Sequence, residues 1–321
     1  MAISVHAFDQ HSERWCAKLE SSRAPFRRFW PKFLFRHEHI ANATKIISAG
    51  VLHSRNQAEL FIDIAAQDVV GRTSRANGFA RLYFRPNTPT QFRVEGIKKP
   101  SEIWHGAHAP VLVMFVIDAK SLLTKEGVRF SNGNMQSQQC DDGDDENFFN
   151  SIAFDDVYHS SGFSPEVKDR ILHARCAEVL APSPMGIREH LSAIVCRSPA
   201  ERAYLLDIIG DELAAEFSNK IVPYTEPGIF VSKWAYVDSV EASDAGFKVR
   251  FHPRADGGLC DFRVDIFSDE IPIHTAGMAA ADLTKIWIVK FPLQRGRYRC
   301  VIRIDDVLAY EATHLVDDLP F

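Results

Sequence analysis

The sequence has no closely spaced pair of cysteines. Any two of them are at least 20 positions apart; they are Cys16, Cys140, Cys176, Cys196, Cys260 and Cys300. A zinc knuckle or a redox dithiol requires two cysteines a few residues apart, so the spacing excludes both kinds of site. We therefore expect reduced, unreactive thiols.

The sequence also lacks a long apolar run. Its longest strongly apolar stretch, from Val111 to Ile117, is far shorter than the roughly 20 residues of a membrane-spanning helix. The first residues do not have the succession of charged, apolar and small residues that is typical of a signal peptide. We therefore expect a cytoplasmic protein with no membrane partner.

An excess of positive charge is absent as well. The formal net charge is -5 at pH 7, and the five acidic residues from Asp141 to Glu146 alone carry a charge of -5. The rest of the chain is near neutral, so any basic surface for nucleic acid must be local. With 321 residues, 46% of them hydrophobic, the chain is long enough for a substantial core and for two domains.

Residues 1–32 form a predicted N-terminal arm in which aromatic and basic residues alternate, in the stretch "RAPFRRFWPKF". Two interpretations stay open for it. Stacking rings and cations suit a single-stranded nucleic acid. Alternatively, the arm packs its aromatic rings on the following domain and leaves its charges in solvent.

Residues 33–220 mix predicted helices and strands. One helix is expected within residues 42–52, with Gly50 as its stop, and a second at 57–75. A third is expected at 198–217, with Ser198 as its cap and Pro199 at its first position. Strands are expected at 79–85, 110–118, 176–182 and 193–197. The prolines of residues 85–93 predict an irregular loop, and the composition of residues 133–147 predicts a mobile surface loop.

Residues 229–321 change to short alternating strands after a break at residues 222–228. These strands are predicted at 229–237, 246–253, 260–267, 286–292, 297–305 and 307–316. So many short strands with turn signals between them predict a small antiparallel β-sandwich as a second domain.

One strand of this sandwich places four arginines on its outer face: Arg295, Arg297, Arg299 and Arg303. They suit a ladder that follows phosphates, or a solvated face whose arginines pair with carboxylates such as Asp261 and Asp265.

Three stretches carry a resemblance to a known family. They are "HIANATKIISAGVL" from His39, "DIAAQDVVGR" leading into "YFRPNTPTQF", and "CAEVLAP" around Glu178, preceded by "RFSNGNMQSQ". In this order and at these separations, they resemble the DarT-type ADP-ribosyltransferases, bacterial toxins that move ADP-ribose from NAD to a nucleobase. The resemblance covers residues 33 to 215. It implies an α+β fold with an ADP-ribosyltransferase-like split sheet, NAD as co-substrate, and no metal.

In the resemblance, the stretch around His39 and Asn42 contributes to binding nicotinamide and ribose. Arg36 and Glu38 stand where the family has a histidine and a threonine, which makes altered nicotinamide contacts an expectation. A register shift of one residue would bring His37 closer to the missing histidine.

The second stretch implies roles at the target base and at NAD. Arg72 matches an arginine that assists at the base, while Tyr83 and Phe84 match an aromatic segment of the cofactor site. Phe79 replaces a tyrosine, and the residues after Pro89 differ from the family pattern. Recognition of the base is therefore expected to differ.

Glu178 matches the catalytic glutamate of the family. Cleavage of the bond between nicotinamide and ribose builds positive charge on the sugar, and a fixed carboxylate stabilises that charge. The same group can hold a ribose hydroxyl or accept a proton from the attacking base. The alternative is an ordinary strand glutamate whose side chain faces water.

The segment before Glu178 is expected to form the loop that presents the substrate. Its Lys168, Arg170 and Arg175 suit phosphates. A base in single-stranded DNA is the expected acceptor, because pairing hides the ring nitrogen in a duplex.

Three hypotheses follow. The first is a toxin that modifies single-stranded DNA, with a macrodomain-type antitoxin as partner and a β-sandwich that binds target, antitoxin or a phage component. The second is an ADP-ribosyltransferase that acts on RNA or protein. The third is a catalytically silent module that binds nucleic acid or a partner.

Overall fold

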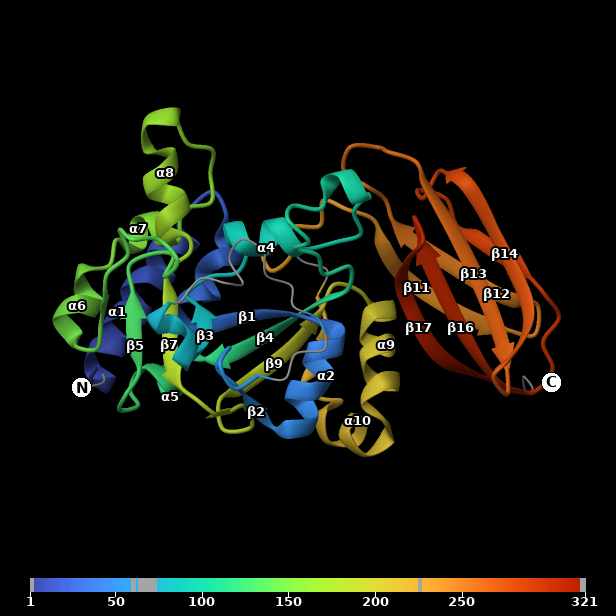
Figure 1. Ribbon diagram of the computed structural model, residues 1–321, viewed down its shortest axis with the longest axis horizontal. Coiled ribbons are helices and arrows are strands. Elements are labelled where there is room, and N and C mark those ends of the chain that lie inside the picture. Colours follow the sequence, from blue (N-terminus) through green and yellow to red (C-terminus); the bar gives the residue numbers. More distant parts are fainter. Residues whose placement is uncertain (1–2, 59–61, 63–73, 225–226, 318–321) are drawn as a thin grey trace.

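The computed structural model describes residues 3–58, 62, 74–224 and 227–317. Most of the helix predicted at residues 57–75 lies outside this range, and so does Arg72. Within this range, a large mixed domain is followed by two smaller antiparallel sheets. Figure 1 shows α9 between the large sheet and these two C-terminal sheets.

The large domain is built on an eight-stranded sheet. In order across the sheet, its strands are β10 (Ile221–Pro223), β9 (Leu191–Cys196), β4 (Leu112–Asp118), β1 (Phe33–His39), β3 (Phe79–Tyr83), β7 (Glu178–Pro182), β5 (Arg129–Ser131) and β6 (Asp142–Gly143). Between β1 and β3, Phe35 and Tyr83 are the one matched pair of residues. The two halves of the sheet therefore meet at a narrow junction, which is the split of the predicted fold.

The predicted central strand is confirmed as β4. Its apolar residues are buried because neighbouring strands flank it and helices cover it. The remaining helices and short elements of this domain are α1 (Val5–Glu20), η1 (Pro25–Lys32), α2 (Ile40–Ala49), β2 (Val51–Leu52), η2 (Arg75–Gly78), α4 (Pro89–Val94), η3 (Pro100–Glu102), α5 (Ala119–Leu123), α6 (Glu146–Ser151), α7 (Phe154–Val157), α8 (Pro165–Ala174), β8 (Met185–Gly186), α9 (Pro199–Ile209) and α10 (Asp211–Phe217).

Glycines end two of the predicted helices. α2 ends at Gly50, whose φ of 70° is the left-handed conformation of a helix C-cap, as predicted. The single helix predicted at 198–217 is wrong, because Gly210 adopts a φ of 81° and divides it into α9 and α10. None of the helices in the described part of the chain has the length and apolar character needed to cross a bilayer.

The N-terminal segment packs on the large domain. α1 buries Trp15 and Leu19, and η1 buries Trp30. The expectation of solvated charges is wrong for Arg27, which is buried and donates a hydrogen bond to the carbonyl oxygen of Tyr158. Phe29 is the exposed ring of this segment, at 47%.

Two predicted loops are wrong. Within residues 85–93, Thr88 caps α4 by accepting a hydrogen bond from the Gln91 N–H, and proline is favoured at the first helical position. Within residues 133–147, the acidic run is tied into the sheet, because Asp142 lies in β6 and pairs with Arg129 at 2.7 Å.

The C-terminal region confirms the predicted sandwich of antiparallel sheets. One sheet holds β11 (Tyr236–Ser243), β12 (Gly246–His252) and β15 (Trp287–Lys290), and the other holds β14 (Ile271–Ala281), β13 (Cys260–Ser268), β16 (Gly296–Ile304) and β17 (Val307–Val316). The sheets share a core in which the Phe251 and Phe262 ring centroids lie 5.3 Å apart. The first strand begins at Tyr236 and not at residue 229, and β14 was not predicted.

The expected pairing with carboxylates is confirmed for Arg299 of β16, but its partners are not the two aspartates named from the sequence. Arg299 pairs with Glu270 and Glu311, at 2.6 and 2.7 Å. Asp265 is instead bound by Arg263 of its own strand.

Candidate active site

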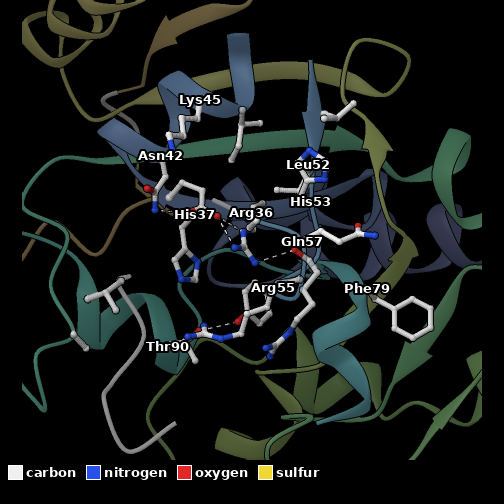
Figure 2. Close-up of a pocket in the computed structure, with 18 of the residues that line it drawn as sticks. Arg36, His37, Asn42, Lys45, Leu52, His53, Arg55, Gln57, Phe79 and Thr90 are labelled. Carbon is white, nitrogen blue, oxygen red and sulfur yellow. Dashed lines mark hydrogen bonds and ion pairs between the residues drawn. The ribbon is translucent and has the colours of Figure 1, made fainter. Parts of the chain in front are cut away.

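A cavity of about 880 Å³ lies beside the junction between β1 and β3. Its walls come from β1, α2, β2, β3 and α4, and Figure 2 shows Arg36 and His37 near its centre, with Asn42 and Lys45 of α2 to one side. This volume lies within the range of roughly 300–1,000 Å³ that is typical of small-molecule sites. Of the predicted site residues, Arg36, Asn42 and Tyr83 line it.

Glu178 is the first residue of β7, and its side chain is 1% exposed. Arg81 binds both carboxylate oxygens, with Nε 2.5 Å from Oε2 and Nη2 2.6 Å from Oε1. The backbone N–H of Glu178 donates to Ser131 Oγ at 2.9 Å. The alternative of a strand glutamate that faces water is therefore wrong.

The antiparallel register between β3 and β7 explains this pair. Tyr83 lies opposite Glu178 and Arg81 lies opposite Leu180, so Arg81 and Glu178 are diagonal neighbours on one face of the sheet. Arg81 lines the cavity, whereas Glu178 is not among the lining residues and lies behind it. Burial opposes the charge of Arg81, but the charge and hydrogen bonds of Glu178 outweigh it and raise the Arg81 pKa above its ordinary value.

Tyr83 and His37 stack in the wall next to this pair, with ring centroids 5.5 Å apart and planes at 7°. Burial, followed by the negative charge of Glu178, raises the pKa of Tyr83 to about 12. Burial and the nearby charges of Arg36 and Arg81 lower the pKa of His37 to about 3. Both rings are therefore neutral at pH 7.

The two residues of the first stretch that depart from the family pattern, Arg36 and Glu38, bind each other. Arg36 Nε donates to Glu38 Oε1 at 2.7 Å, and Arg36 Nη1 donates to the carbonyl oxygen of Arg81 at 3.3 Å. Glu38 is buried, so its charge requires this partner. The substitution of histidine and threonine thus creates an ion pair in the wall of the cavity.

Asn42 lines the cavity, whereas His39 does not. Asn42 Nδ2 donates to the Ile62 carbonyl oxygen at 2.7 Å, and Asn42 Oδ1 accepts from the Ile62 N–H at 3.1 Å. His39 caps α2, with Nδ1 accepting from the Ala41 N–H at 3.1 Å, and is not among the residues that line the cavity. Burial and His108 lower the His39 pKa to about 4.

Phe84 does not reach the cavity. Successive strand residues point to opposite faces, so Phe84 lies on the face opposite Tyr83 and is buried against Phe154, with 5.3 Å between their ring centroids. The expected contact of Phe84 with the cofactor is therefore wrong. Arg72 lies outside the described residues.

The segment expected to be a substrate loop contains a helix, α8, which extends away from the sheet at the upper left of Figure 1. Lys168 and Arg170 are exposed on it, and Arg170 pairs with Asp156 at 3.0 Å. Arg175 follows the helix and lies over the ring of Phe163, with Nη2 2.9 Å from His159 Nδ1.

Several cavity residues were not predicted. Arg81 is the one in contact with Glu178, and further cations come from separate elements: Lys45, Arg55 and Arg93. The alternation along β3 could have indicated Arg81, because Arg81 lies between Ala80 and Leu82 and points to the opposite face of the strand. Which residue of β7 Arg81 contacts depends on the register between β3 and β7, and the sequence does not reveal that register.

Comparisons with known proteins match the large domain. The family model described as "ssDNA thymidine ADP-ribosyltransferase, DarT" matches residues 35–226, more than half of the chain. A search of curated proteins finds no match.

Among solved structures, DarT from Thermus sp. 2.9 is similar. The complex with ADP-ribosylated ssDNA has 15% identity and a TM-score of 0.46, covering 60% of this chain and 92% of that one. The complex with NAD+ has 14% identity and a TM-score of 0.46, covering 60% of this chain and 96% of that one. The complex with carba-NAD+ has 16% identity and a TM-score of 0.44, covering 60% of this chain and 93% of that one. On the match to the family model, the chain belongs to the DarT family and is an NAD-dependent ADP-ribosyltransferase.

Proposed function

We propose that this enzyme transfers ADP-ribose from NAD to a thymine base of single-stranded DNA and releases nicotinamide. The observation that carries the proposal is the buried Glu178 carboxylate, held by Arg81 beside a cavity of about 880 Å³. The family description, which names thymidine in ssDNA, supports the choice of acceptor.

The residues around the cavity fit NAD. Cations line its walls, namely Arg36, Lys45, Arg55, Arg81 and Arg93, and they suit the negative charge of a pyrophosphate. Apolar wall residues such as Val94 and Trp104 suit flat rings. Bound NAD would supply a ribose that is already activated by its bond to a cationic nicotinamide ring.

Glu178 would supply the negative charge that this chemistry needs. The sugar becomes more positive as nicotinamide leaves, so a carboxylate fixed in a site with little water favours the transition state over the ground state. Two hydrogen bonds from Arg81 fix the carboxylate in position. Tyr83, which stays protonated, has a hydroxyl that accepts from Thr90 and remains able to donate.

The acceptor would reach the cavity as a single strand, because pairing in a duplex hides the attacking nitrogen of thymine. Exposed Lys168 and Arg170 of α8 would contact the phosphates of the strand. By the family resemblance, the enzyme would act as a toxin, and its antitoxin would be a macrodomain-type hydrolase that removes the modification.

A panel of acceptors tests the proposal. The enzyme and labelled NAD are incubated with four oligonucleotides, namely single-stranded DNA with thymine, the same strand without thymine, its duplex, and the equivalent RNA. We expect label on the first strand alone, and mass spectrometry then places the adduct on the base. Label on RNA or on protein, with none on thymine, would contradict the proposed acceptor.

A further inference from the structure

Arg81 offers an inference that deepens the proposed function and rests on it. We propose that Arg81 is a positioning residue that keeps Glu178 ionised and in one orientation, so that Glu178 works as a fixed negative charge and does not take the proton of the acceptor. No motif of the three matching stretches includes Arg81. The inference comes from the geometry of β3 and β7.

The first step is the exclusiveness of the contact. Within the described part of the chain, both side-chain hydrogen bonds of Glu178 come from Arg81, and its ion pair is with Arg81 as well. A further arginine of the cavity wall, Arg36, is bound to Glu38. A buried carboxylate stays charged only when a partner compensates for lost hydration, and here that partner is Arg81.

The second step is the neutrality of the remaining neighbours. Tyr83 of β3 lies opposite Glu178, Cys176 lies just before β7, and Cys140 lies just before β6. Burial and then the charge of Glu178 raise their pKa values, to about 12 for Tyr83, about 12 for Cys176 and about 11 for Cys140. His37 of β1 is neutral as well, since burial lowers its pKa to about 3. Arg129 of β5, opposite Leu180, is paired with Asp142 and Asp144. In the described part of the chain, Arg81 is therefore the cation that binds Glu178.

The third step is chemical. In the reaction, the bond between ribose C1′ and the nicotinamide nitrogen breaks, and its electron pair leaves with nicotinamide. A lone pair of the acceptor nitrogen forms the new bond to C1′, and the proton of that nitrogen passes to solvent water. A carboxylate that already accepts two charge-assisted hydrogen bonds is a weak base, so it is suited to stabilising charge and poorly suited to removing this proton.

Three variants test the inference. Arg81→Met removes the charge, and Arg81→Gln, which keeps a donor and is less disruptive, serves if the first does not fold. Arg188→Met is the matched control, because Arg188 holds Glu216 at the surface with Nε 2.7 Å from Oε1. Folding is checked by thermal melting for each.

Two readouts are followed as the pH is raised from about 5 to 9, a range that covers the titration of a buried carboxyl group. The first is the infrared band of the Glu178 carboxyl, isolated by subtracting the spectrum of Glu178→Gln. The second is the transfer rate. In the parent and in Arg188→Met, we expect an ionised Glu178 throughout and no dependence of the rate on its titration.

In Arg81→Met or Arg81→Gln, we expect a protonated carboxyl band near neutral pH and a transfer rate about 100-fold below the parent. Both should return toward the parent as the pH rises. An ionised Glu178 and a parent-like pH profile in these variants would overturn the inference. If the parent cleaves no NAD and labels no DNA, the proposed function fails instead, and the infrared band still decides whether Arg81 controls the charge of Glu178.

Discussion

The pairs Arg197–Glu201 and Arg81–Glu178 each hold a buried glutamate, and their surroundings differ. Arg197 and Glu201 are each 1% exposed at the side chain, and Arg197 lies over the ring of Tyr236 at 4.9 Å. Arg81 is 18% exposed and lines the cavity, while Glu178 is 1% exposed. The same two residue types thus serve two purposes. Protein surrounds the first pair, and the second borders space for a substrate.

The Arg197 pair holds the two parts of the chain together. Arg197 also donates to the carbonyl oxygen of Pro110, which precedes β4, and the neighbouring Ser198 Oγ donates to the Val237 carbonyl oxygen at 2.6 Å. Because Tyr236 and Val237 belong to β11, these contacts connect the large sheet with the C-terminal sheets. The comparison teaches that access to a cavity, rather than burial of charge, separates a candidate catalytic pair from a structural one.

Loss of the structural pair should give the largest change in stability. Arg197→Met leaves the Glu201 charge buried without its partner, so the free energy of unfolding should fall by about 3–5 kcal/mol. Urea unfolding of the whole chain measures it, and Arg188→Met at the surface is the control. NAD affinity of the folded variant should stay near that of the parent, and a loss of affinity as large as the loss of stability would contradict the distinction between the pairs.

Lowering the pH should reduce the free energy of unfolding through two histidines of the large domain, His37 and His39. The unfolded pKa of histidine is about 6.5, whereas the folded values are about 3 for His37 and about 4 for His39. Below about pH 6.5 the unfolded state binds protons that the folded state does not. Stability is therefore complete above that pH and falls toward pH 4 and 3, by up to about 1.4 kcal/mol per pH unit for each histidine.

Urea unfolding at several pH values measures this loss. His37→Gln should make the loss shallower than in the parent, and the exposed His6 provides the control variant His6→Gln. An unchanged slope in His37→Gln would argue against a neutral His37 beside Arg36 and Arg81.

A third pair, Arg36 with Glu38, is the most exposed of the three, with side chains 25% and 2% exposed. Arg36→His and Glu38→Thr each leave one partner alone, whereas the double variant restores the residue types of the family pattern. We expect the double variant to bind NAD better than the sum of the single effects predicts, by about 1 kcal/mol. Calorimetry of NAD binding measures this coupling, and strictly additive effects would contradict an ion pair that matters for the cavity.

Asn42 should give the smallest effect. Asn42→Ala removes two hydrogen bonds to the backbone of Ile62 and should lower stability by about 1 kcal/mol. Thermal melting compares it with Asn147→Ala, at an exposed position of α6. Equal melting temperatures for the two variants would show that the contacts with Ile62 contribute little.

Much of the fold was predictable where periodicity and caps agree. The apolar run of β4, the end of α2 at Gly50 and the start of α9 at Pro199 were all found in the sequence. β14 was missed because it forms an edge strand, largely exposed and rich in small residues, without clear alternation. Gly210 lies within a continuous helical pattern, so the break there depended on a backbone angle that the pattern does not reveal.

The site was predictable only as far as the motifs extend. Glu178 was selected from its motif, but its partner Arg81 is 97 positions away, and a diagonal contact requires the register of β3 on β7. Phe84 was assigned to the cofactor because it follows Tyr83, although alternation along a strand sends the two rings to opposite faces. Long-range contacts of this kind come from tertiary packing.

Transfer from labelled NAD to a single-stranded oligodeoxynucleotide with one thymine tests the central claim most directly. The parent is compared with Glu178→Gln and with Glu189→Gln, a surface glutamate that pairs with Lys125 at 2.8 Å. We predict a labelled thymine from the parent and from Glu189→Gln, and a loss of about 1,000-fold in Glu178→Gln with its fold intact. Equal labelling by Glu178→Gln, or none by the folded parent, would contradict the account.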